Sequence, residues 1–142
     1  MSRSSVKYAI AFGLIILATP TRAAELVVSN GVFHGGDHAP RDTTSGEVAV
    51  VRLENGKYEI RLGSHFNTTP GPDLFVYLSA STDPQNSPAV VKDIFANLGK
   101  LTSSTGAQRI SISKHVHLKE YNSVVIWCKQ YSILFGAAPL QQ

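Results

Sequence analysis

Cys128 is the only cysteine in the sequence, so a disulfide within the chain is excluded. It ends the apolar run 124–128, in which strand alternation places Cys128 on the face of Val124 and Ile126 and places Trp127 on the opposite face. A redox-active thiol or a thiolate ligand needs partial exposure and an electropositive neighbour. A buried free cysteine instead behaves as a small hydrophobic residue. Both interpretations stay open.

Two histidine pairs could contribute metal ligands. His34 and His38 lie in a glycine-rich loop, and His115 and His117 are spaced to share one face of a strand. Each pair alone is a weak signal. We expect loop and surface histidines and no metal site.

Two complete ligand sets can be considered with these histidines. Two histidines and Cys128 resemble the equatorial ligands of a blue-copper centre, but the only methionine, Met1, belongs to the N-terminal leader described below. Zinc would accept two histidines, Cys128 and an acid such as Asp37. Neither set is complete on sequence evidence.

Hydrolytic chemistry has less support. The sequence has no Gly-x-Ser-x-Gly elbow and no His-Glu-x-x-His pair. The acids Asp37, Asp73 and Asp83 lie in turn contexts that explain them without acid–base work. No hydrolase or transferase signature remains, and an enzymatic activity would at most be a redox one.

The first 23 residues have the pattern of a cleaved signal peptide. Arg3 and Lys7 precede an apolar run over 8–18 that is too short to span a membrane. Small residues at Thr21 and Ala23 predict cleavage after Ala23, with Ala24 as the second choice, which leaves residues 24–142 as one domain. We expect an exported, periplasmic or secreted protein without a membrane span in the mature chain.

The charge of the mature chain excludes some partners. The sequence has 13 basic and 10 acidic residues, and three of the basic ones, Arg3, Lys7 and Arg22, belong to the leader. The mature chain is therefore close to neutral. No run of Lys and Arg remains that could follow a phosphate backbone or a membrane surface, so we expect no nucleic-acid partner.

The clearest structural unit is a hairpin over residues 47–62. Asn55-Gly56 predicts a two-residue type I′ turn that would pair Leu53 with Tyr58 and Val51 with Ile60. This register also predicts two charge pairs across the strands, Glu54 with Lys57 and Arg52 with Glu59.

The remaining pattern indicates an all-β domain. Residues 123–135 are too long for one strand of so small a domain, so we expect a break at 129–130 and strands covered on both faces. The fold class is a single small antiparallel β-sandwich. A loop follows the strand 74–78, and residues 117–121 form a helical turn. Further strands are expected at 26–28, 31–33, 108–113, 124–128 and 131–135.

Several segments in the same order resemble the DM-thirteen domain, a family labelled as an electron-transfer domain that also occurs in Skeletor-type and Knickkopf-type cell-surface proteins. The most specific are the Gly-Pro-Asp segment 71–79 and the Trp-Cys segment 121–128. The other matching segments are Tyr131-Ser132-Ile133, Phe135-Gly136-x-Ala138, His38 before Ser45-Gly46-Glu47-Val48, and Leu98-Gly99-Lys100-Leu101 before Gly106-x-Gln108.

The resemblance implies an extracytoplasmic β-sandwich in which Cys128 acts in redox chemistry, either bare or as a ligand to haem. It favours a partly accessible thiol and a small exported redox or electron-transfer module that meets an envelope or extracellular protein. The alternative is a binding or structural module of the cell envelope in which Cys128 is only a core residue. The residues themselves identify neither the partner nor a cofactor.

Overall fold

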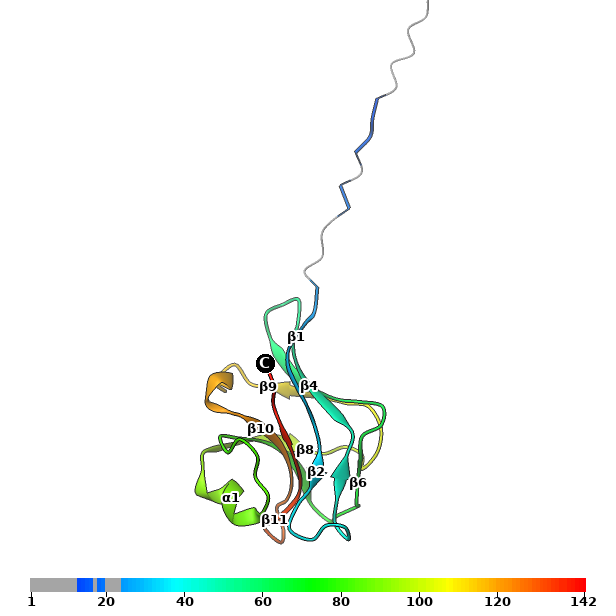
Figure 1. The fold of residues 1–142 in the computed structure, drawn as a ribbon. Helices are drawn as coiled ribbons and strands as arrows, with labels where there is room; N and C mark the ends of the chain where they lie inside the picture. The colour runs from blue at the N-terminus through cyan, green and yellow to red at the C-terminus, as the bar shows by residue number, and fades with distance from the viewer. Residues whose placement is uncertain (1–12, 17, 20–23) are drawn as a thin grey trace, which may run out of the picture.

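The structure is a computed structural model that describes residues 13–16, 18–19 and 24–142. From β1 onward the chain forms antiparallel strands with little helix (Figure 1). None of the helices among the described residues is long and apolar enough to cross a membrane. The leader cleavage predicted after Ala23 lies outside these residues.

The strands form two main sheets and one small one. The four-stranded sheet has the order β1 (Leu26–Val32), β4 (Glu47–Arg52), β5 (Tyr58–Leu62) and β9 (Gln108–Ile112). The five-stranded sheet has the order β2 (His34–Gly35), β11 (Ile133–Pro139), β10 (Ser123–Cys128), β7 (Leu74–Ser79) and β8 (Phe95–Lys100). The small sheet pairs β3 (Thr44–Ser45) with β6 (Asn67–Thr68), and the helical segments are α1 (Ser87–Lys92) and η1 (Leu118–Glu120).

The main core lies between the two large sheets. Val50 and Ile60 from the four-stranded sheet belong to the same buried cluster as Val76 and Ile126 from the five-stranded one. A second cluster covers the other face of the five-stranded sheet, where Val90 of α1 packs with residues of β10 and β11. The all-β sandwich expected from the sequence is therefore confirmed.

Strand β10 is central in the five-stranded sheet, between β7 and β11. All six of its residues are buried, as expected for a strand covered on both faces. The break expected at 129–130 is also present, because β10 ends at Cys128 and β11 begins at Ile133 after a turn. The helical turn expected at 117–121 is η1.

The hairpin of β4 and β5 does not have the predicted register. Arg52 lies opposite Tyr58 and Val50 opposite Ile60, one residue out of step with the predicted pairs. In β5, Tyr58 and Ile60 face the core, as predicted. In β4, however, Val50 faces the core, and Val51 lies opposite Glu59 on the outer side of the sheet. Because side chains alternate, the one-residue shift exchanged the two faces of β4.

The loop of this hairpin explains the shift. Leu53 N–H donates to the carbonyl oxygen of Lys57 at 2.7 Å, and Gly56 N–H donates to the carbonyl oxygen of Leu53 at 2.9 Å. With Gly56 at φ +81°, the loop has three residues and a left-handed glycine at its end. Asn55-Gly56 therefore forms part of a three-residue loop, which is one residue longer than the predicted type I′ turn. Glu54 lies in that loop, so the predicted pairing of Glu54 with Lys57 across the strands is replaced.

The charge pair predicted between Arg52 and Glu59 is likewise not formed. Buried Glu59 accepts a hydrogen bond from Arg61 Nε at 2.6 Å and lies 3.7 Å from Arg109 of β9. Arg61 also donates to Glu25 at 2.7 Å. The hydrogen bonds to Glu59 and then to Glu25 raise the pKa of Arg61, so its guanidinium group stays charged.

Gly56→Val is expected to lower the free energy of unfolding by about 1–2 kcal/mol, because a β-branched residue resists positive φ. A Cβ at this position would meet only Arg52 Nη2 at 3.9 Å, so crowding contributes little. Chemical denaturation followed by circular dichroism measures the change. Gly56→Asn is the control, since asparagine tolerates left-handed backbone, and equal losses for both variants would contradict this explanation.

Helix α1, strand β8 and the two-residue strands β2, β3 and β6 were not predicted. Helix α1 lies within the expected loop after β7, where the Asn86 side chain accepts a hydrogen bond from Ala89 N at 3.0 Å and caps the helix. Edge strand β8 contains Asn97 and Gly99, residue types that strands disfavour. Pairing with β7 overrides this local preference.

Candidate functional site

Cys128 is the last residue of β10 and lies inside the main core. Its exposure is 0%, and it belongs to the same buried cluster as Val124 and Ile126, on the face that strand alternation predicted. Across the sheet it is paired with Leu74 of β7 and Ile133 of β11. The expectation of a partly accessible thiol was therefore wrong, because the Cys128 side chain belongs to the core cluster buried between the two sheets.

Trp127 lies on the opposite face, as predicted, and so does not stack on the thiol. Its ring stacks with Tyr77 at a centroid distance of 6.0 Å, and Tyr77 stacks in turn with Phe95 at 5.2 Å. Phe75 meets Tyr77 edge-on at 6.5 Å and carries the ammonium group of Lys129 at 5.2 Å from its ring centroid. These aromatic rings cover the outer face of the five-stranded sheet beside Cys128.

Burial raises the pKa of the Tyr77 hydroxyl, and the negative charge of Asp73 adds to the effect. The folded state therefore holds this proton more tightly than the unfolded state does, and Tyr77 contributes stability that is present below pH of about 10 and lost as the pH rises through its folded pKa. At alkaline pH, we expect the free energy of unfolding of Tyr77→Phe to fall less steeply with rising pH than that of the native protein. Denaturation at several pH values, with tyrosinate absorbance, measures this, and identical slopes would contradict it.

The histidine pairs do not converge. His34 donates through Nε2 to Asp83 at 2.6 Å, whereas His38 Nδ1 accepts a hydrogen bond from Arg41 at 3.1 Å. His115 and His117 lie beyond the end of β9 in an exposed loop, so they do not share a strand face as expected.

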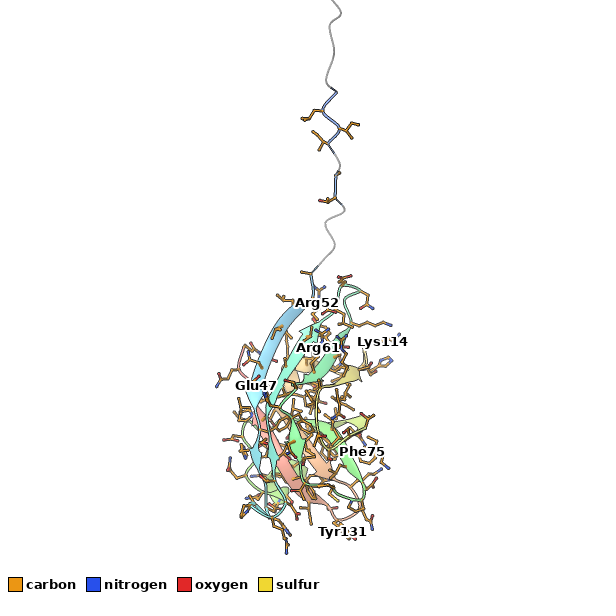
Figure 2. The ribbon with its side chains drawn as sticks, turned by 90° about the vertical axis from the view of Figure 1, so that its right-hand side faces the viewer. Glu47, Arg52, Arg61, Phe75, Lys114 and Tyr131 are labelled. Carbon is orange, nitrogen blue, oxygen red and sulfur yellow. The ribbon has the colours of Figure 1, made fainter. Side chains whose placement is uncertain are left out.

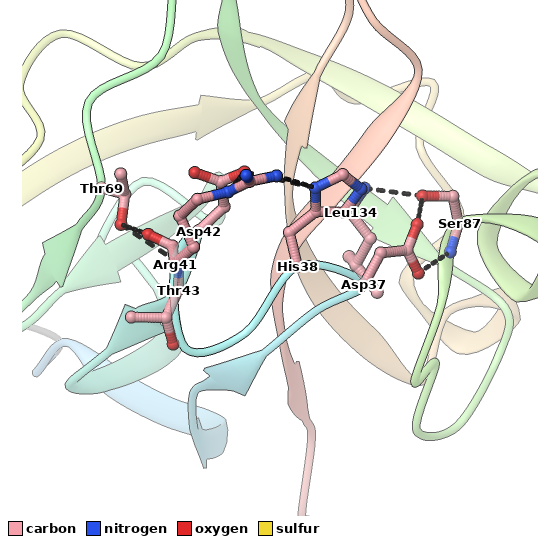
Figure 3. A network of polar contacts seen from close by, with 8 residues as sticks. All are labelled: Asp37, His38, Arg41, Asp42, Thr43, Thr69, Ser87 and Leu134. Atoms are coloured by element: carbon pink, nitrogen blue, oxygen red, sulfur yellow. Dashed lines mark hydrogen bonds and ion pairs between the residues drawn. The ribbon is translucent and has the colours of Figure 1, made fainter.

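The described residues contain no cluster of three His, Cys, Asp or Glu side chains that could hold a metal ion. The ligand sets considered from the sequence are therefore not assembled in this part of the chain. Asp37 has a structural role, because Ser87 donates to it through both N–H and Oγ, while Ser87 Oγ accepts from Leu134 N at 2.9 Å (Figure 3). These bonds fasten the start of α1 to β11.

Haem, the cofactor that the resemblance implies, does not fit at Cys128. An axial thiolate must contact the iron at one side of a large flat ring. Cys128 is 0% exposed, and its cluster is filled by apolar side chains from both sheets.

Comparison with protein families decides where this fold belongs. A family model described as Electron transfer DM13 matches residues 33–140, which run from the residue after β1 to the residue after β11. The chain belongs to this family. No curated protein and no solved structure matches the chain. The matched region thus includes Cys128, Trp127, the whole five-stranded sheet and the four-stranded sheet apart from β1, and the family's description supports a role in electron transfer.

Proposed function

We propose that this protein is exported and acts in electron transfer outside the cytoplasm, with the Cys128 thiol as its redox group. The match to the electron-transfer family over residues 33–140 carries the proposal. The leader pattern supports export, and Cys128 is the only thiol that the chain offers.

The position of Cys128 limits how it can react. A thiol of 0% exposure meets a partner only when the end of the β10–β11 hairpin opens. Tyr131 in the adjoining turn is 61% exposed, and three contacts hold the strand end closed: the pairings of Cys128 with Leu74 and Ile133, and the hydrogen bond from Lys129 N to Asp73 O at 2.9 Å. Local opening of such a strand end needs less free energy than global unfolding.

The chemistry that fits a single gated thiol is exchange with a partner's disulfide. The Cys128 thiolate attacks one sulfur of that disulfide, a new S–S bond forms, the old one breaks, and the departing sulfur takes up a proton. The partner disulfide is the oxidant. Because the sequence has one cysteine, the product is a disulfide between two molecules.

Glutathione disulfide is the probe for this reaction. Native protein should gain one glutathione, seen as a single mass increase, at a rate that low denaturant does not change because local opening limits it. Cys128→Ala should gain none. Adding Gln130→Cys to the Cys128→Ala variant places a thiol at an exposed position of the same turn. Its glutathionylation rate is that of a thiol that needs no opening of the strand end.

The alternative is a binding or structural module of the cell envelope, and the burial of Cys128 among apolar residues favours it. In that case glutathionylation requires global unfolding, and its rate increases with denaturant. Fluorescence of the single tryptophan, Trp127, reports the unfolding. Export is tested separately. The mature N-terminus should be Ala24 in the exported fraction of an expressing cell, and an uncleaved chain would contradict it.

A further inference from the structure

Two adjoining recesses lie at one end of the sandwich. The inner one, of about 250 Å³, opens between the two sheets. Val50 and Leu78, which are 1% and 0% exposed, line it from opposite sheets, so it reaches down to the main core. The rest of its apolar wall comes from Val28, Leu118 and Leu140, with polar residues such as Asn122 beside them.

The outer recess is an open groove of about 1150 Å³ between the β4–β5 turn and the loop that follows β9. It shares Tyr58, Leu118 and Lys119 with the inner recess, so the two recesses adjoin at these side chains. Its floor includes the apolar side chains of Ile112 and Val116. A molecule lying in the groove could therefore extend an apolar part into the sandwich.

The groove is cationic. Lys57, Lys114 and Lys119 line it together with His117, and no Asp or Glu of the described residues does. Lys114 and Lys119 take part in none of the ion pairs formed within this part of the chain. Figure 2 shows Lys114 at the end of the molecule where Arg52 lies, away from the end that carries Tyr131.

We propose that this end of the sandwich binds a single-chain anionic amphiphile of the fatty-acid class. Its carboxylate would lie among the three lysines, where charge-assisted hydrogen bonds stabilise an anion, and its chain would enter the inner recess. Lys119 lines both recesses and stands where head and chain meet. The site is independent of the function proposed for Cys128, which lines neither recess.

Calorimetric titration with dodecanoate tests the proposal on the mature protein. We expect saturable binding of one molecule. Dodecanol lacks the charge and should bind at least tenfold more weakly, acetate lacks the chain and should not bind, and removing two carbons from dodecanoate should weaken binding about tenfold. Dodecanol binding as tightly as dodecanoate, acetate binding equally well, or uptake without saturation would each overturn it.

Variants locate the site. Changing Lys114 and Lys119 together to glutamine should weaken dodecanoate binding about tenfold while leaving dodecanol binding unchanged. Lys92→Gln, on α1 and outside both recesses, is the matched control and should change neither. Val28→Trp should weaken both ligands by filling the inner recess, at an unchanged melting temperature. An unaltered dodecanoate affinity in the double lysine variant would overturn the proposal whether or not the tryptophan variant folds.

Discussion

Gly46→Ala is expected to lower the free energy of unfolding by about 3 kcal/mol or more. Gly46 joins β3 to β4 at φ +101°, a backbone conformation that alanine rarely adopts. A Cβ there would lie 2.6 Å from Phe66 Cα and 2.8 Å from the carbonyl oxygen of His65, so backbone would have to move. Denaturation monitored by circular dichroism measures the loss.

Gly106→Ala separates the two causes. Gly106 also has positive φ, at +84°, but a Cβ there would meet no atom within 4 Å. Its loss should be about 1–2 kcal/mol, which is the cost of the left-handed backbone alone. If the two variants lose the same stability, the close approach of Phe66 to Gly46 is not what requires glycine.

Cys128→Ser is expected to lower the free energy of unfolding by about 1–3 kcal/mol, because it places a hydroxyl in the apolar core between the sheets. Cys128→Ala should cost less than the serine change or about as much, since it removes one sulfur atom and introduces no polar group. Urea denaturation followed by Trp127 fluorescence measures both variants.

The order of the two variants is the informative result. Serine clearly worse than alanine would agree with the 0% exposure of Cys128. Serine as stable as the native protein would mean that water reaches this position in the folded state, which the closed end of β10 does not allow. Both measurements are independent of the redox activity proposed for the thiol.

Helix α1 shows why some elements were not predicted. Local patterns around Ser87 and Pro88 are typical of a turn, yet Pro at the start of a helix is also favourable. The Asn86 cap and the hydrogen bonds between Ser87 and Asp37 stabilise the helix, and Asp37 is 50 residues away in the chain. Contacts of that separation are invisible in a local pattern.

The hairpin shows a different limit. Asn55-Gly56 correctly located the turn and the positive φ of glycine. Two loop lengths are compatible with this dipeptide, and they place opposite faces of β4 toward the core. The interactions of Glu59 with Arg61 and Arg109 on the outer face, together with Val50 in the core, agree with the longer loop.

The all-β class could be predicted because short runs of strand-forming residues alternate with turn residues along the chain. The strand ending at Cys128, the opposite faces of Cys128 and Trp127 and the break before β11 could be predicted because they follow from alternation and length along one short segment. The burial of Cys128 and the cationic groove, in contrast, depend on how distant strands pack together. Strand β7, which pairs beside the thiol, is distant in sequence, and Lys57 lines the same groove as Lys114 and Lys119 because β5 pairs with β9. Exposure and charge density depend on which distant segments meet, and a linear pattern does not contain that information.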